Sequence, residues 1–562
     1  MPTRHVMLIH KLVPLTILVL SQTSFAQQAP TAGSQMQQIP PSPVPQKAAP
    51  VMRIEQQRAV PSVPGADQTK IIVNSLQVTG AQVYTQAELV ALTGFTPGRE
   101  LSLSELNAMA LKITERYRRD GYFVAQAYLP AQDIKDNTVT IAVLEGHYGK
   151  VTLNNQTNLS EAQAKRLLSG LNSGDIIATE PLENRLLLLS DLPGVKVSST
   201  LVPGASLGTS DLIVDVVPGQ RVTGSIDADN AGNRYTGEYR VGATVNLNNP
   251  LGLGDVASLR VLSSGSGLNY ARGSYQLQFG KARAGVAYSK LSYKLGEEFK
   301  PLQAHGTAEV ASIFGSYPLL RSRKSNLNVG LAYDAKKFHD LVDLTSSVTD
   351  KKARVLTASL YGDQRDMLGG GGVTVYSLTG STGTIDIQTP AALAADAVTA
   401  RSNGHFNKLG FNASRLQALG GPFSLYAGIN GQVASKNLDI SEKMELGGMN
   451  AVRAYPEGEA YADQGYVLNL EARMQLPKFS EQMPGEMQLI GFIDTGSVTI
   501  NKNPWFAGPN TRTLNGAGVG LTWAENNNFF VRAFYARKLG SERAISAPDK
   551  SGRFWVQAVK YF

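Results

Sequence analysis

Residues 466–476 read YVLNLEARMQL, and from Leu468 onward apolar and polar side chains alternate along this stretch. One face carries Tyr466, Leu468, Leu470, Ala472, Met474 and Leu476, and the other carries Val467, Asn469, Glu471, Arg473 and Gln475. A period of two indicates a β-strand with one apolar face. Such a face belongs either in the core of a sandwich or on the lipid side of a barrel wall.

The same alternation continues through the C-terminal part of the chain. After Pro218 no helical period survives, and we count 16 candidate strands up to Phe562. Strands of about ten residues cross a bilayer when they are tilted. An even number of strands, with long loops alternating with short turns, is typical of outer-membrane barrels. Closure of the sheet also removes the exposed edges that an open sheet would have. We therefore predict a mainly β protein in which residues 219–562 form a 16-stranded transmembrane antiparallel β-barrel. Its last residue, Phe562, looks like the aromatic C-terminal assembly signal of such barrels.

The N-terminus carries the marks of export. Arg4 and Lys11 supply positive charge, residues 12–20 are apolar, and Ser24-Phe25-Ala26 is a small-x-small cleavage signal, so residues 1–26 are predicted to be a signal peptide. Residues 27–69 are rich in Pro, Gln, Ala and Ser, a composition that predicts a mobile periplasmic linker.

Two similar small units are expected between the linker and the barrel. Residues 70–146 and 147–218 each show the order β-α-α-β-β. In the first unit, Ser102 and Glu105 form a capping box at the start of a helix; in the second, Leu182, Leu186 and Leu189 share a helical face. Two consecutive copies of one α+β module favour a docking arm.

Composition and motifs exclude several functions. The net charge of +8 falls to +6 (8 − 2) without Arg4 and Lys11, and no basic run with interleaved aromatics is present, so nucleic acid is not an expected partner. The chain has no cysteine for disulfides or thiolate metal sites. The G-x-S-x-G match at 204–208 falls between two predicted strands rather than at a strand-to-helix elbow. Asp227, Asp229, Gly232 and Glu238 resemble a calcium loop but lack the ligand at position 5, and residues 369–372 lack the Lys-Ser/Thr of a P-loop. We expect no enzymatic activity, cofactor, metal or nucleotide.

Several motifs in this chain are similar to those of one family. They are Val143-Leu144-Glu145-Gly146, residues 249–255 (NPLGLGD), residues 317–323 (YPLLRSR), Leu446-Gly447-Gly448 followed by Val452-Arg453-Ala454-Tyr455, and residues 491–496 (GFIDTG). With the signal peptide, the two modules and the barrel, the chain resembles the transporter subunit of two-partner (type V) secretion systems, the haemolysin and filamentous-haemagglutinin exporters. The small modules then correspond to POTRA domains.

The resemblance implies a site inside the barrel. A long loop at 437–463 would fold inward, carrying Val452, Arg453 and Tyr455 as its pore or gating residues. Residues Phe492, Asp494 and Gly496, which alternate onto one face, would receive it on the barrel wall. A loop this long is usually functional or disordered, and an arginine inside a barrel needs a carboxylate. We therefore predict an Arg453–Asp494 ion pair; the alternative is two unrelated solvated charges. The loop departs from the family signature at Ala454, where glycine is usual, which leaves open how tightly its tip turns.

The resemblance also implies a function. The protein would lie in the bacterial outer membrane, inserted by the barrel assembly machinery, with its POTRA domains in the periplasm. It would capture an unfolded partner through that partner's N-terminal secretion domain and export it. The expected partner is a large secreted β-helical exoprotein: an adhesin, a cytolysin or a haem-acquisition protein. The alternatives are an outer-membrane protein insertase, a passive porin and an enzyme. The family tends to carry an N-terminal plug helix, which the proline-rich segment matches poorly, so the block in the resting pore is left open.

Overall fold

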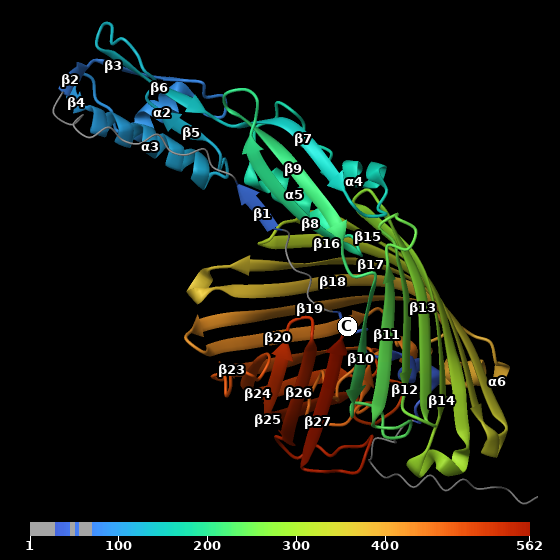
Figure 1. Ribbon diagram of the computed structural model, residues 1–562. Coiled ribbons are helices and arrows are strands. Elements are labelled where there is room, and N and C mark those ends of the chain that lie inside the picture. The colour runs from blue at the N-terminus through green and yellow to red at the C-terminus, as the bar shows by residue number, and fades with distance from the viewer. Residues whose placement is uncertain (1–28, 45–50, 55–69) are drawn as a thin grey trace, which may run out of the picture.

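A barrel with two small domains stacked at one end makes up the chain (Figure 1). This computed structural model describes residues 29–44, 51–54 and 70–562, so the predicted signal peptide at residues 1–26 lies outside the described residues. We call the barrel end next to the small domains the domain end, and the other the far end. Among the described residues, no helix is both long and apolar enough to cross a membrane.

Within residues 70–562, sixteen antiparallel strands close the barrel in sequence order. They are β10 (Val222–Asp229), β11 (Arg240–Asn248), β12 (Val256–Ser263), β13 (Leu268–Phe279), β14 (Ala282–Lys294), β15 (Ala304–Arg321), β16 (Ser325–Val342), β17 (Ser347–Asp366), β18 (Gly372–Ile387), β19 (Gly404–Gly420), β20 (Phe423–Ala434), β23 (Gln464–Gln475), β24 (Glu486–Thr499), β25 (Thr511–Glu525), β26 (Phe529–Lys538) and β27 (Gly552–Tyr561). The predicted fold class is confirmed.

Pairing of the first strand with the last closes the barrel. β10 lies antiparallel to β27, from Ser225 opposite Tyr561 to Asp229 opposite Gln557. Phe562 extends this pairing by one residue, because its N–H donates to the carbonyl of Gly224 at 3.1 Å and its own carbonyl accepts from the Gly224 N–H at 2.9 Å.

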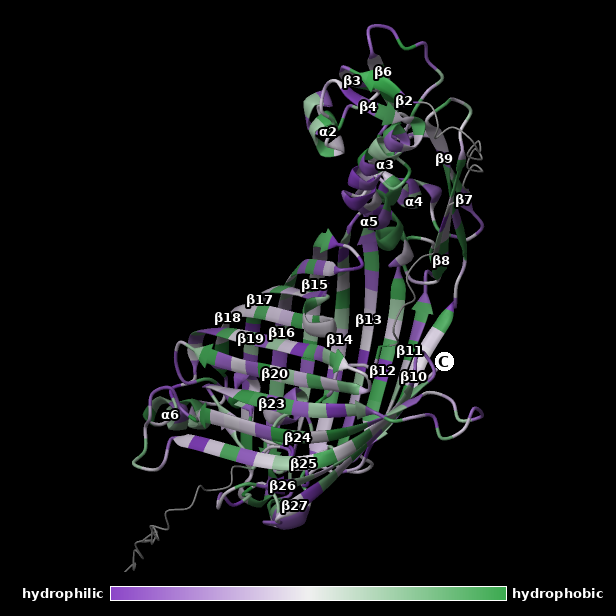
Figure 2. Cartoon of the chain, turned by 90° about the vertical axis from the view of Figure 1, so that its left-hand side faces the viewer, coloured by the Kyte–Doolittle hydropathy of each residue, from purple (hydrophilic) through white to green (hydrophobic). Residues whose placement is uncertain are grey.

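Alternation of side chains gives the barrel an apolar outside and a polar inside, seen as banding along its strands in Figure 2. The outer face exposes large apolar side chains such as Ile313, Leu331 and Leu470, whereas Val467, Glu471 and Asp494 are buried on the inner face. The strands are not uniformly the ten residues expected. β15 and β16 have 18 residues each and β17 has 20, because β16 and β17 stay paired over their whole length, from Ser325 opposite Gln364 to Val342 opposite Ser347.

The first small domain packs two helices against a sheet of order β3-β6-β5. Its elements are β2 (Lys70–Val73), β3 (Ser75–Thr79), α2 (Gln86–Thr93), β4 (Arg99–Ser102), α3 (Leu103–Arg119), β5 (Gln126–Tyr128) and β6 (Thr138–Leu144). The predicted capping box is present: Ser102 accepts from the Glu105 N–H, and Glu105 accepts from the Ser102 N–H. The additional short strand β4 pairs with β2.

The second small domain has β7 (His147–Asn155), α4 (Glu161–Leu168), α5 (Thr179–Ser190), β8 (Val195–Pro203) and β9 (Thr209–Pro218). Its core includes Leu182, Leu186 and Leu189, which α5 presents to the sheet as predicted. The G-x-S-x-G match at 204–208 forms the turn between β8 and β9, where the Thr209 hydroxyl donates to the Ser206 carbonyl at 2.6 Å.

Part of the segment that we predicted to be a mobile periplasmic linker, residues 27–69, is instead anchored. Helix α1 (Ala32–Gln37) lies inside the barrel against β14, β15, β16 and the 3-10 turn η5 (Ile440–Glu442). Thr31 caps it, and the Ala32 N–H donates to Asp340 Oδ1 at 2.8 Å. Strand β1 (Val51–Ile54) joins the sheet of the second domain. Composition indicated no helix or strand here because the contacts that hold both segments come from distant parts of the chain.

Candidate functional site

Residues 435–463 connect β20 to β23 and fold from the far end into the lumen; we call them the inward loop. The loop contains η5 and the short strands β21 (Met444–Glu445) and β22 (Tyr461–Ala462), which pair with each other. Backbone hydrogen bonds continue the hairpin toward its tip, from Leu446 N–H to the Ala460 carbonyl and from Gly448 N–H to the Tyr455 carbonyl. The tip presses against the inner face of β23 to β27.

The guanidinium of Arg453, at the tip of the inward loop, forms ion pairs with two carboxylates. Its Nε and Nη2 donate to Asp494 Oδ2 and Oδ1 at 2.9 and 2.7 Å, and its backbone N–H also donates to Asp494 Oδ2 at 3.0 Å. Its Nη1 donates to Glu471 Oε1 at 2.8 Å. The Arg453 side chain is only 4% exposed and that of Asp494 is 0% exposed. A planar guanidinium can bind one carboxylate with two parallel bonds and still reach a second.

Aromatic rings enclose the same guanidinium. Its central carbon lies 3.5 Å from the ring centre of Phe492 and 4.9 Å from that of Phe534, and the two rings meet edge to face. Trp555 on β27 donates its indole N–H to the Arg453 carbonyl at 2.6 Å. The charge is therefore held by ion pairs at its edge and by ring faces above it, away from water.

The other predicted loop residues pack tightly. Val452 and Tyr455 are fully buried, and the Tyr455 hydroxyl donates to the Glu542 carbonyl at 3.2 Å. Glycines on the wall make room for the loop: a Cβ at Gly496 would lie 2.4 Å from Leu446 Cδ1, and a Cβ at Gly516 would lie 2.6 Å from the Cβ of Ala454. Ala454 has no positive φ. The methyl group that replaces the usual glycine is therefore accommodated by Gly516 on β25, not by the turn.

Ion pairs also hold the parts of the inward loop near β20 and β23 against the barrel wall. Glu442 pairs with Lys336 at 2.7 Å and Lys408 at 2.8 Å, and Asp439 pairs with Lys351 at 2.7 Å. Burial alone would raise the pKa of the Glu442 carboxyl, but the two ammonium groups hold it below its ordinary value. Glu459 pairs with Arg512 on β25.

The residue that follows helix α1 binds the inward loop at one of two adjacent buried carboxyls. Gln38, which follows α1, donates from Nε2 to the Tyr461 hydroxyl at 2.7 Å and to Glu445 Oε1 at 3.2 Å. Burial raises the pKa of the Glu445 carboxyl well above its ordinary value, and the adjacent Glu457 raises it further. Burial likewise raises the pKa of Glu457, against the opposing effect of Arg240. Like charges so close cannot both ionise easily, so this pair holds a proton more tightly than two free carboxyls would.

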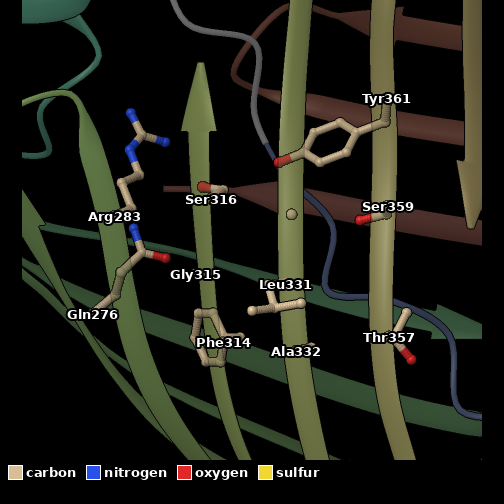
Figure 3. A pocket seen from close by; sticks show the side chains of 11 residues that line it. Gln276, Arg283, Phe314, Gly315, Ser316, Leu331, Ala332, Thr357, Ser359 and Tyr361 are labelled. Atoms are coloured by element: carbon tan, nitrogen blue, oxygen red, sulfur yellow. The ribbon is translucent and has the colours of Figure 1, made fainter. Parts of the chain in front are cut away.

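A cavity of about 330 Å³, lined by both polar and apolar residues, remains in the lumen toward the domain end. Its lining includes Gln276, Arg283, Ser316, Ser359 and Tyr361, which come from adjacent strands β13 to β17 (Figure 3). The lumen is thus partly filled by α1 and the inward loop, and a cavity with several polar side chains remains beside them.

All six residues predicted for the site meet at one place. Val452, Arg453 and Tyr455 of the loop lie against the wall that carries Phe492, Asp494 and Gly496, and the Arg453–Asp494 pair is formed. Sequence reasoning missed Glu471, Phe534, Trp555 and Gly516. Glu471 had a usable signal, because it sits on the polar face of 466–476 and lies opposite Phe492 in the strand register.

The residues that resemble a calcium loop have other partners. Asp227 and Asp229 lie on β10, where they pair with Arg260 at 2.8 Å and with Arg240 at 2.9 Å. Within the described chain, no group of three or more His, Cys, Asp or Glu residues is arranged to hold a metal ion.

Comparison with known families gives two matches. The model of the haemolysin secretion/activation protein ShlB/FhaC/HecB family matches residues 208–523. The model of the ShlB-type POTRA domain matches residues 71–146.

Among curated relatives, the chain is 31% identical over 474 residues to the heme/hemopexin transporter protein HuxB of Haemophilus influenzae, covering 83% of this chain and 82% of HuxB. It is 23% identical to the outer membrane transporter CdiB of Dickeya dadantii, covering 78% of each chain. Among solved structures, CdiB from Escherichia coli shares the fold with a TM-score of 0.67 at 20% identity, covering 90% of this chain and 93% of that one. BamA from Haemophilus ducreyi lacking POTRA domains 1–3 shares it more distantly, with a TM-score of 0.52 at 14% identity, covering 88% of this chain and 100% of that one.

Proposed function

We propose a mechanism of export for this chain, which belongs to the haemolysin secretion/activation protein ShlB/FhaC/HecB family and is an outer-membrane transporter of two-partner secretion. It captures an unfolded exoprotein in the periplasm on its two small domains and passes it through the barrel to the cell surface. One observation carries this proposal: the lumen of a closed barrel is occupied by two segments, α1 and the inward loop, that only non-covalent contacts hold to the wall.

Capture uses strand edges. The sheets of the two small domains present edges to which an extended chain can add by β-augmentation, which supplies affinity through main-chain hydrogen bonds without demanding a particular sequence. The N-terminal secretion domain of the exoprotein is the segment that binds.

Passage requires that α1 and the inward loop leave the lumen. Val452, Arg453 and Tyr455 act as the gate, and Phe492, Asp494 and Gly496 act as its seat. The polar side chains of the cavity lining, among them Gln276 and Tyr361, support a path for an extended chain, because they offer it hydrogen bonds in place of those it makes with water. Folding of the exoprotein outside the cell prevents its return and drives export without a nucleotide, a metal, a cofactor or a catalytic step.

The partner is a large β-helical exoprotein. An adhesin, a cytolysin and a haem-acquisition protein all fit such an exporter, and the 31% identity to a heme/hemopexin transporter favours the last. For its own insertion the barrel depends on the assembly machinery, for which Phe562 is the signal.

The test is a secretion assay in which the chain is expressed with the exoprotein encoded beside its gene. Exoprotein in the medium with the transporter, and its retention in the periplasm without it, is the expected result. Periplasmic retention in both cases contradicts the proposal.

The same assay separates the exporter from an insertase. Deletion of the chain is expected to leave the other barrel proteins of the outer membrane at their normal levels. A general loss of those barrels would favour the insertase. The solved structures support the exporter, since BamA is the more distant neighbour.

A further inference from the structure

Three cations lie together on the outer face of β16 and β17, the side of the barrel that faces lipid. Lys336 and Lys351 point into the lumen, where they pair with the inward loop. Because successive side chains of a strand point to opposite faces, the next residues, Lys337 and Lys352, point outward, and so does Arg354. All three are exposed. Lys337 lies directly opposite Lys352 in the strand register, so one small ligand can reach all three side chains.

These three residues, which we call the basic cluster, carry charge that no described carboxylate pairs with. In the part of the chain that the structure describes, their side chains make no ion pair or hydrogen bond. The nearby carboxylates have other partners: Glu309 pairs with Lys290 at 2.9 Å, Asp350 pairs with His339 at 2.6 Å, and Asp386, opposite Lys352 in the register, accepts from Gln388 at 2.6 Å. Like charges directly opposite each other destabilise a sheet. An anion from outside the chain would remove that repulsion.

The basic cluster lies where the lipid-facing apolar band of the barrel ends. Toward the domain end, the outer face of β15, β16 and β17 exposes Ile313, Tyr333 and Leu356. Tyr288 on β14 marks the border, since Lys290 follows it on the same face. Outer-membrane barrels carry such an apolar band with aromatic residues at both edges. The domain end faces the periplasm, so the basic cluster lies among the headgroups of the outer leaflet.

A hollow of about 330 Å³ opens on the outer face beside the basic cluster. Its polar lining comes from three neighbouring strands and includes Thr307, Glu309, Lys337, His339, Asp350 and Lys352. Pockets of about 300–1,000 Å³ hold small ligands. There is room here for a phosphorylated headgroup next to two ammonium groups.

The far-end border of the outer face is different on β24 and β25. The outward side chains that follow the exposed Ile493 are neutral and satisfy one another: Thr495 donates to Asn515 at 2.6 Å, and the hydroxyl oxygens of Ser497 and Thr513 lie 2.8 Å apart. Such a row needs no anion. The basic cluster is therefore a local feature of one side of the barrel.

We propose that the basic cluster binds the phosphorylated lipid of the outer leaflet, the lipid A part of lipopolysaccharide. A phosphate group lies between Lys337 and Lys352, and the planar guanidinium of Arg354 binds it with two parallel bonds. The acyl chains lie along the apolar band over Tyr333 and Leu356. The bound lipid fixes β16 and β17 in the outer leaflet. This site goes beyond the proposed export function and depends only on the orientation of the barrel.

Native mass spectrometry of the purified full chain in detergent, with added lipid A, tests the site. The wild type is expected to retain lipid A when the micelle is removed. K337Q/K352Q/R354Q is expected to lower the ratio of bound to free chain about tenfold or more, because each cation near an anionic lipid adds to the attraction. K337R/K352R/R354K keeps the charge and is expected to bind as the wild type does. Equal binding by the wild type and the glutamine variant overturns the inference.

The matched control, K324Q/R365Q/K478Q, removes three exposed cations at the domain end and should bind lipid A as the wild type does. The mobility of unheated samples in electrophoresis shows that each barrel is folded.

A second measurement needs no variant and uses lipid A from which the phosphate groups have been removed. Weak binding of this lipid to the wild type is the expected result. Binding as tight as that of intact lipid A overturns the inference, because it assigns the contact to the acyl chains. Release of lipid A by millimolar inorganic phosphate also overturns it, because the basic cluster is then a site for a free anion.

Discussion

At the scale of single residues, Arg453 makes several of the contacts that hold the inward loop against the barrel wall. Its guanidinium bridges Asp494 on β24 and Glu471 on β23, and Arg473 pairs with the second oxygen of Glu471 at 2.6 Å. Two cations and two carboxylates therefore balance, and Arg453, Asp494 and Glu471 among them are buried. Removing one member of such a buried set leaves an uncompensated charge, which typically costs about 3–5 kcal/mol.

Arg453→Ala is expected to release the loop tip and to reduce export strongly while the barrel still reaches the outer membrane. Arg453→Lys is expected to restore only part of the export, because an ammonium group is a point charge that cannot bind Asp494 with two parallel bonds and also reach Glu471. Exoprotein in the medium, measured at equal barrel level, is the readout. Arg365→Ala, at an exposed arginine, is the control that should export normally, and normal export by Arg453→Ala would exclude a role for the pair.

The Glu445–Glu457 pair predicts a pH dependence. Because burial raises both pKa values, the folded loop holds a proton that the released loop would lose. The stabilisation is complete below the ordinary carboxyl pKa and is lost as the pH rises through the raised values. The groups facing the pair include Gln38, Tyr461 and Asp229 and two cations, Arg240 and Arg532.

Channel openings in planar bilayers are therefore expected to become more frequent as the pH rises from about 6 to about 9. Glu457→Gln removes the second charge and should flatten this dependence, whereas Glu486→Gln, at an exposed carboxyl on β24, should leave it unchanged. An identical pH profile for wild type and Glu457→Gln would show that the pair does not control the loop.

At the scale of elements, α1 shows how context creates structure. A six-residue helix is too short to be stable in water by itself. Here Asp340 accepts from its first N–H, Thr236 on the β10–β11 connection donates to Gln35, and Gly33 lies close against Ser441. The lumen supplies the partners that the helix lacks alone.

Gly33→Leu is expected to expel α1, because even a Cβ at this position would lie 2.9 Å from the Cβ of Ser441. The expected result is a larger and more frequent ion conductance in bilayers. Val44→Leu is the matched control in the same N-terminal segment, since Val44 is 78% exposed. Equal conductance of the two variants would mean that α1 does not block the pore.

At the scale of the whole molecule, the second small domain is seated firmly on the domain end of the barrel. Arg321 at the end of β15 binds Asp191 with two bonds of 2.7 and 2.8 Å. The Ser160 N–H donates to the Gly252 carbonyl at 2.7 Å, and Asn158 donates to the Asn249 carbonyl at 2.9 Å. Two of the motifs that carry the family resemblance, 249–255 and 317–323, therefore lie at this junction.

Arg321→Ala is expected to loosen the second domain without unfolding the barrel, because the lost pair is partly exposed and contributes on the order of 1 kcal/mol. Spin labels on K196C and R365C would report this as a broader distance distribution. The control Lys300→Ala, at an exposed lysine in the connection between β14 and β15, should keep the narrow distribution. A distribution unchanged by Arg321→Ala would show that the remaining contacts suffice.

The closed barrel, the two small domains and the central contact of the site could all be predicted from the sequence. Alternation along 466–476 and its neighbours follows from the pleat of a strand, and the meeting of Arg453 with Asp494 was expected from the motifs at 446–455 and 491–496 that carry the family resemblance. These signals are local, so they survive without knowledge of the fold.

The positions of the remaining parts depend on contacts between segments that lie far apart in the sequence. The cage of Glu471, Phe534 and Trp555 around Arg453 depends on which strands are neighbours when the barrel closes. The helix at 32–37 and the strand at 51–54 belong to a segment whose composition indicates neither. Segments this short have too little local preference to specify a structure, so the groups that bind them across the fold decide their conformation.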